Sequence, residues 1–266
     1  MAQSAPHYAT NKIINKIKSF SGFLFWLIFV LSIFENILPL LDLKISKEQT
    51  KIISNISTPI NIISIIIFFF LELFIEVIMI PIADGKRRDD FLDNSIGSRF
   101  SLTQSNGYYD NDEVTPGLYK VAVNMFENCY FTHSLVKNIT ITRIVTPFIA
   151  VLAILVFAYY GFNQQSTIAV LLLQLLFSAT IFGNLVKHIV LLVKLNQIEK
   201  DWTTLFNKPN FKANPETEAP TIYRNWLNYE TLHSRIPASI PDKVYKKLNP
   251  QLTSDWIALK SQYNIS

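Results

Sequence analysis

Two glutamates inside a long apolar stretch are the residues whose type and spacing most suggest chemistry. Glu72 and Glu76 interrupt the segment from Pro59 to Ile82, which otherwise consists mainly of Ile, Phe and Leu. Four residues apart, they share one helix face. At ~1.5 Å per residue, Glu76 lies about 9 Å and Glu72 about 15 Å inside a membrane boundary at Ile82. A carboxylate there is costly unless it is paired, protonated or hydrated. The pair predicts a cation-attracting lining, a proton-sensitive gate, or an interhelical bond that only holds helices together.

Other polar residues fall in the remaining apolar stretches. A polar stripe near the end of the last stretch could bond to the glutamates or line a path with them: Gln174, Ser178, Asn184, Lys187 and His188. In the first stretch, Glu35 with Asn36 and the following Asp42 could form an acidic mouth. Snorkelling side chains, or an Asn bond between helices, explain this second set as well.

A charged cluster follows the second stretch directly. Lys86, Arg87 and Arg88 favour contact with anionic lipid headgroups, and a nucleotide phosphate site is the alternative. The following carboxylates, Asp89, Asp90 and Asp93, have a spacing that could hold Mg²⁺ on a diphosphate, as in a lipid-processing enzyme. The alternative is a solvated helix start whose acids pair with nearby arginines. Because such catalysis needs a second acidic set, we expect no enzyme, no metal and no cofactor.

Established motifs give no further site. The four histidines are scattered without ligand spacing, and no Walker A, GxSxG, HExxH or Rossmann pattern occurs. The single cysteine, Cys129, permits no intrachain disulfide. The net charge of +4 is small and dispersed, which argues against DNA or RNA as a partner.

Composition indicates the elements that position these residues. The 266 residues are 50% hydrophobic and only 17% charged, which is too apolar for one water-soluble domain. Four apolar stretches are long enough to cross a bilayer, at about 22–41, 59–82, 144–162 and 167–186. We therefore predict an all-α polytopic membrane protein with four transmembrane helices in two hairpins.

Basic residues predict the orientation. The hairpin between the third and fourth stretches carries no charge, whereas the N-terminal tail and the segment between the hairpins are basic near the membrane. Both termini are therefore expected in the cytoplasm. The predicted organisation is a tail (1–20), a first hairpin (21–83), a cytoplasmic insert (84–142), a second hairpin (143–195) and a helical C-terminal region (196–266).

The insert and the C-terminal region are each too small to build a good core alone, so we expect them to pack together as one helical cap. In the insert, turns are predicted at Asn106-Gly107 and Pro116-Gly117, with helices over 88–96 and 118–137. The tail predicts helices near 221–234, 241–248 and 253–263.

This order of parts resembles the four-span pore-forming effectors associated with SMODS-type cyclic-oligonucleotide synthases in bacterial antiphage defence. The likeness rests on a hairpin followed by the charged segment Ala83–Phe91, a tight second hairpin and a helical tail. The Gln- and Ala-rich N-terminal helix of that family is replaced here by the segment Asn11–Lys16, and no functional residue is carried over. The resemblance implies an oligomeric inner-membrane effector that permeabilises the bilayer when its cap binds a cyclic oligonucleotide. A non-conducting membrane scaffold is the alternative, and a Mg²⁺-dependent lipid enzyme is the third.

Overall fold

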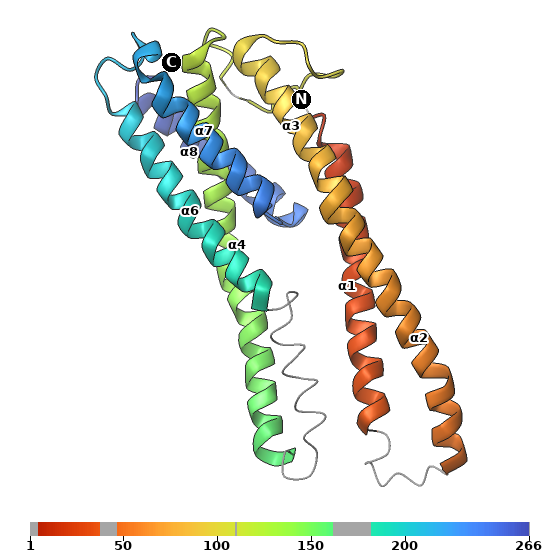
Figure 1. The fold of residues 1–266 in the computed structure, drawn as a ribbon. Coiled ribbons are helices and arrows are strands. Elements are labelled where there is room, and N and C mark those ends of the chain that lie inside the picture. The colour runs from red at the N-terminus through yellow and green to blue at the C-terminus, as the bar shows by residue number, and fades with distance from the viewer. Residues whose placement is uncertain (1–4, 38–46, 110, 162–181, 266) are drawn as a thin grey trace. The chain divides into compact units, whose positions relative to one another are not determined.

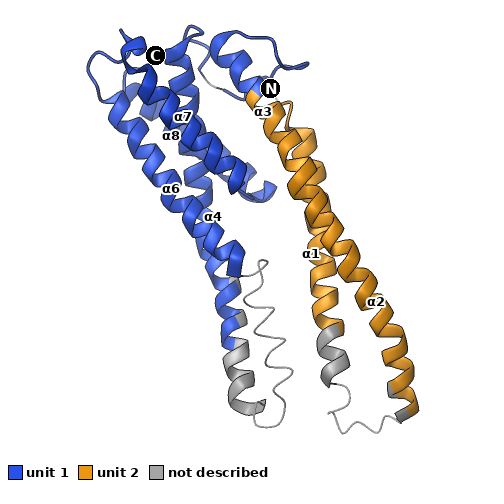
Figure 2. Cartoon of the chain, in the orientation of Figure 1, with its two compact units in different colours: residues 1–4, 89–266 blue, residues 5–88 orange. Residues whose placement is uncertain are grey.

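The computed structural model describes residues 5–37, 47–109, 111–161 and 182–265. Within these ranges the chain is helical and contains no β-strand, so the predicted all-α class is confirmed there. The chain divides into two compact units, residues 5–88 and residues 89–266 with the first four (Figures 1 and 2).

The smaller unit is an antiparallel helical hairpin. Helix α1 (Tyr8–Ile37) packs against α2 (Lys47–Phe74), which continues without a break through the π-helical turn η1 (Ile75–Met79) into α3 (Ile80–Ile96). The turn is defined by a hydrogen bond from the Ile80 N–H to the Ile75 carbonyl.

Both hairpin helices bury a stripe with alternating steps of three and four residues, the spacing of a coiled coil. On α1 the buried and half-buried stripe is Thr10, Ile14, Ile17, Ser21, Leu24 and Ile28, and His7, just before the helix, continues it. On α2 it is Ser57, Asn61, Ser64, Phe68 and Leu71, and it ends at Ile75 of η1. Many of these interface residues are small or polar, as in helix pairs that pack inside membranes.

The outside of the hairpin is apolar. Exposed large side chains cover α1 at Phe20, Phe23, Trp26 and Val30, and α2 at Ile56, Ile60, Ile63, Ile66, Phe69, Phe70 and Leu73. A water-soluble monomer rarely exposes an apolar patch above a few hundred Å². Polar side chains inside and apolar side chains outside are the reverse of a soluble helical pair.

The larger unit is built on two long helices, α4 (Leu118–Gly161) and α6 (Phe182–Phe206). The one-turn helix η2 (Pro215–Glu218), α7 (Ala219–Arg235) and α8 (Asp242–Gln262) complete it, with the last residues of α3 and the loop that follows. A single cluster of buried apolar residues joins residues of the insert and the tail, including Phe91, Phe126, Trp202, Ile222 and Trp256. The insert and the tail thus form one body.

Aromatic rings dominate the centre of this body. The Phe126 ring stacks on Phe206 with centroids 5.1 Å apart and meets the Trp256 ring edge-on at 5.5 Å. Phe91 packs against Trp226 at 5.5 Å. Such pairs add to the hydrophobic stabilisation of burying the rings.

Three helix boundaries predicted from the sequence are wrong. The helix expected over 88–96 is the end of α3, because the shift from apolar to charged residues at Ala83 does not interrupt backbone hydrogen bonding. The helix expected over 118–137 continues to Gly161 as α4. The two helices expected at 241–248 and 253–263 are one, α8, which contains Pro250.

Among the residues that the structure describes, two helical stretches are long and apolar enough to cross a membrane, Tyr8–Leu31 and Lys51–Ile96. In the second, the charged residues gather after Ile82, so the apolar part corresponds to the predicted span 59–82. The predicted span 144–162 falls on the end of α4, whereas residues 162 and 167–181 of the last two spans lie outside the described residues.

Candidate functional site

The interface of the hairpin contains a polar seam, which we define as Ser21, Ser57, Asn61, Ser64 and Glu72. The Ser21 hydroxyl on α1 donates a hydrogen bond to Glu72 Oε1 on α2, with an oxygen–oxygen distance of 2.5 Å. Ser21, Ser57, Asn61 and Ser64 are all buried between the two helices. Glu72 therefore has a partner within its own hairpin, on a residue that the sequence did not single out.

Glu76 lies in the π-helical turn and is exposed. A π-turn contains one residue more than an α-helical turn, so the glutamates four apart do not keep the α-helical relation that the sequence predicts. Isolated π-turns occur often at functional sites. Both glutamates are exposed, but Glu72 also accepts the bond from Ser21 across the hairpin.

An apolar layer separates the seam from the charged end of the hairpin. Ile14, Ile75 and Ala83 form its buried core, with Ile17, Met79 and Ile80 packed around them. Beyond this layer, Lys86 Nζ donates to Thr10 Oγ1 at 3.1 Å.

The basic trio is divided by the fold. Lys86 bonds to α1, and Arg87 is buried with its Nε 3.9 Å from Asp84 Oδ1. Arg88 is exposed. Only Arg88 and the ammonium group of Lys86 therefore remain placed for the headgroup contact that the sequence predicts for all three.

The predicted Mg²⁺ alternative at Asp89, Asp90 and Asp93 does not match the geometry. The Asp93 carboxylate accepts four hydrogen bonds, from the hydroxyls of Ser98 and Ser101 and the backbone N–H groups of Phe100 and Ser101. Asp90 accepts the Ser105 N–H at 2.8 Å. These carboxylates anchor the loop after α3, and no group of three metal-binding side chains occurs among the residues that the structure describes.

Asp90 and Asp93 lie one helical turn apart, and their pKa values are shifted in opposite directions. Burial raises the pKa of Asp90, and the bond from Ser105 offsets this only in part. Burial also raises the pKa of Asp93, but the donors of Ser101, Phe100 and Ser98 outweigh it and leave the pKa below its ordinary value. The number of hydrogen bonds that each carboxylate accepts decides whether its pKa is raised or lowered.

The stripe predicted in the last apolar stretch is only partly visible. Gln174 and Ser178 lie outside the described residues, and Asn184 and Lys187 are exposed on α6. His188 is buried, and its Nε2 lies 2.9 Å from the hydroxyl of Thr140 on α4. In the first stretch, Glu35 belongs to α1, but its side chain lies outside the described residues.

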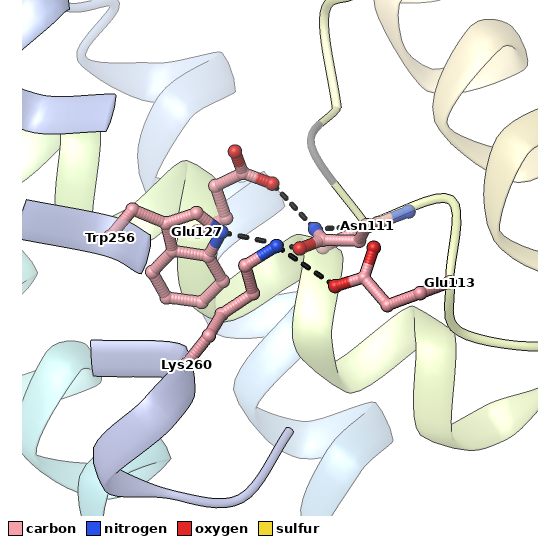
Figure 3. A network of polar contacts seen from close by, with 6 residues as sticks. Asn111, Glu113, Glu127, Trp256 and Lys260 are labelled. Atoms are coloured by element: carbon pink, nitrogen blue, oxygen red, sulfur yellow. Dashed lines mark hydrogen bonds and ion pairs between the residues drawn. The ribbon is translucent and has the colours of Figure 1, made fainter. Parts of the chain in front are cut away.

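The larger unit contains a buried polar network that was not predicted from the sequence (Figure 3). Asn111 Nδ2 donates to Asn124 Oδ1 at 2.8 Å and to Glu127 Oε2 at 2.6 Å, and its Oδ1 accepts the Trp256 indole N–H at 3.2 Å. Asn124 in turn donates to Asn94 and Ser95 at the end of α3. A signal was present, because Asn124 and Glu127 interrupt the apolar face of the predicted helix.

Lys260 extends this polar region toward the surface. Its Nζ lies 2.9 Å from Glu113 Oε1, and this ion pair closes one side of the network. Burial raises the pKa of Glu113, but the bond from Lys260 outweighs it, so the pKa is lowered. The loop before α4, α4 itself and α8 are thus connected by polar contacts as well as by the core.

No family model matches the chain, and neither the curated proteins nor the solved structures contain a match. The function must therefore be inferred from the residues and the geometry of this chain. Of these, the hairpin has the least ordinary arrangement, with serine and asparagine side chains buried between its helices, an exposed carboxylate bonded across them, and aliphatic side chains outside.

Proposed function

We propose that this protein is an integral membrane effector that permeabilises the inner membrane when its helical body receives a cytoplasmic signal. The observation that carries the proposal is the inverted hairpin, in which Ser21, Asn61 and Ser64 are buried at the interface while large aliphatic and aromatic residues face outward. Lipid is the solvent that stabilises such an exterior.

In this proposal, α1 is one of four membrane spans, and residues 59–82 of the continuous helix formed by α2, η1 and α3 are another. The other two are the end of α4 and the segment 167–186. Both termini, the insert (84–142) and the C-terminal region (196–266) are on the cytoplasmic side, as the distribution of basic residues predicts.

The conducting path is formed by several copies of the chain, because a single hairpin is too small to enclose one. Glu76, exposed within the apolar stretch, is the carboxylate best placed to face another copy or an ion path. Intramembrane acids of this kind commonly mark such paths.

The signal reaches the membrane through continuous helices. The helix formed by α2, η1 and α3 runs without a break from the apolar stretch to Ile96. Helix α4 runs from the core of the larger unit at Val121 to an apolar end at Gly161. The resemblance described above implies a cyclic oligonucleotide as the signal.

The test is membrane potential after induced expression in bacterial cells, read with a potential-sensitive dye. Inside-out inner-membrane vesicles, whose cytoplasmic face is turned to the medium, are assayed alone and with added 3′,5′-cyclic di- and trinucleotides. The wild-type chain should collapse the potential, and the double variant Glu72→Gln with Glu76→Gln should weaken this effect. The matched control is Glu48→Gln in the first turn of α2, outside the apolar stretch, which should leave it unchanged. An intact potential with surviving cells under every condition would remove the proposal.

The bond between Ser21 and Glu72 favours a second candidate, a non-conducting membrane scaffold in which Glu72 only holds the hairpin together. The same double variant separates the two functions. A lower melting temperature in detergent with an unchanged cellular phenotype would favour the scaffold.

A further inference from the structure

The π-helical turn η1 divides the continuous helix formed by α2, η1 and α3 into two parts, and the buried stripes of these parts are out of phase. Before the turn, the stripe Ser57, Asn61, Ser64, Phe68, Leu71, Ile75 predicts that the next interface positions are Ile78, Ile82 and Gly85. The residues that cluster with Ile14 of α1 are instead Met79 and Ala83, with Ile80 beside them. The extra residue of the turn has moved the stripe on by one position.

The skipped residues have the character of a second interface. Ile78 and Ile82 are each 46% exposed, although their spacing continues the stripe of α2. In contrast, the charged residues Asp84 and Arg87 of the same turns are buried. The sequence thus contains two competing stripes over the same few turns.

Gly85 supports the second stripe independently. A glycine inside a helix is unfavourable relative to alanine, and a Cβ built at Gly85 meets no atom within 4 Å. The observed packing therefore gives no reason for glycine here. In the skipped stripe Gly85 faces α1, where a missing side chain lets two helices approach closely.

We propose that η1 is a register switch between these two stripes. Conversion of the π-turn to α-helix removes one residue from the turn and rotates the following helix by about 100° about its own axis. Ile78, Ile82 and Gly85 then face α1, and Met79 and Ala83 leave the interface.

The switch deepens the proposed function and rests on it for its biological meaning. It acts next to the apolar layer of Ile14 and Ile75, and it changes the direction of Glu76, which lies within the turn itself. Rotation of α3 also breaks the bond between Lys86 and Thr10. A helix whose two packings differ little in free energy is a known basis for switching.

Cysteine cross-linking in native membranes reads the register directly. Ile14→Cys on α1 is paired in turn with Ala83→Cys, Ile82→Cys and Pro81→Cys, and a protease site inserted between Leu41 and Asp42 reveals whether a disulfide joins the fragments. The native thiol does not compete, because Cys129 is fully buried and burial raises its pKa well above the ordinary value. The Ala83→Cys pair reports the observed stripe, the Ile82→Cys pair the second stripe, and the Pro81→Cys pair neither.

We expect the Ala83→Cys pair to form fastest, and the Ile82→Cys pair to form several-fold faster than the Pro81→Cys pair. Deletion of Val77 removes the extra residue while keeping the faces of α3, so it should lower the Ile82→Cys rate to that of Pro81→Cys and spare Ala83→Cys. Equal rates for the Ile82→Cys and Pro81→Cys pairs, an Ile82→Cys rate unchanged by the deletion, or failure of the Ala83→Cys pair would overturn the switch. Cross-linking does not depend on conductance, so loss of the switch and loss of the effector function are separate results.

Discussion

The two units bury opposite kinds of side chain. The larger unit buries Phe126, Trp202 and Trp256 at its centre, whereas the hairpin buries Ser21, Asn61 and Ser64 and exposes Phe69 and Phe70. The same amino-acid types therefore take opposite positions within one chain. This contrast supports the proposed function, in which water surrounds the body formed by the insert and the C-terminal tail and lipid surrounds the hairpin.

The largest expected effect lies in the larger unit. Trp256→Ala removes a fully buried ring that contacts Phe126 and donates to Asn111, so the free energy of unfolding should fall by about 3–5 kcal/mol. Denaturant unfolding of the detergent-solubilised chain, followed by tryptophan fluorescence, measures it. The neighbouring Ile257→Ala, at an exposed position, should change the unfolding free energy little.

A matched pair of exposed residues compares the two surfaces. Phe70 in the hairpin and Leu227 on α7 are each 62% exposed. Phe70→Asp should disfavour membrane insertion by ~2.5–3.5 kcal/mol, because its side chain would face hydrocarbon. Leu227→Asp should have almost no effect. Membrane and soluble fractions after alkaline extraction give the readout, and equal behaviour of the two variants would refute the proposed difference in solvent.

The loop after α3 should respond to pH through Asp93. Its pKa is lower in the folded state than the ordinary value of 3.8, so it contributes stability above that value, which is lost as the pH falls through the folded pKa. Asp93→Asn should therefore destabilise the loop at neutral pH, by about 1–3 kcal/mol, and the difference from wild type should vanish in acid.

Asp90 is the matched control, because its pKa is raised on folding. Its buried charge disfavours the folded state at neutral pH, and this penalty is relieved as the pH falls through the raised pKa. Asp90→Asn should cost far less than Asp93→Asn at neutral pH. Hydrogen exchange of residues 98–105 as a function of pH measures both variants, and equal losses would contradict the assignment.

The smallest expected effect is at the polar seam. Ser21→Ala removes the donor to Glu72 and should lower hairpin stability by ~0.6–1.7 kcal/mol, the range measured for hydrogen bonds between membrane helices. Thermal unfolding in detergent gives the value, with Ser19→Ala on the exposed side of α1 as the control. A loss equal to that of the control would show that the bond contributes nothing.

The helical class could be predicted from the sequence because the apolar stretches are long and nearly continuous. The site was less accessible. The presence of Glu72 in such a stretch was evident, but its partner Ser21 depends on the register of two helices, which periodicity within one helix does not determine. The π-turn was also hidden, because the residues from Ile75 to Met79 do not differ in type from their α-helical neighbours.

The polar network of the larger unit was missed for a related reason. Asn111 precedes α4 in a loop, where asparagine is ordinary, and its bonds to Asn124 and Trp256 join residues far apart in the chain. For the acidic segment the sequence left two alternatives, Mg²⁺ binding and pairing with nearby arginines. The donors that occupy Asp93 come instead from the following loop, whose path the sequence does not specify.

The most direct test of the proposed membrane hairpin is to measure whether lipid or water surrounds it. A nitroxide spin label placed at Phe70→Cys, and separately at Leu227→Cys, in membrane-reconstituted protein reports collision rates with oxygen and with a water-soluble nickel chelate. The account predicts that the label on the hairpin meets oxygen and is shielded from nickel, and that the label on α7 shows the reverse. Free access of nickel to the hairpin position would contradict it.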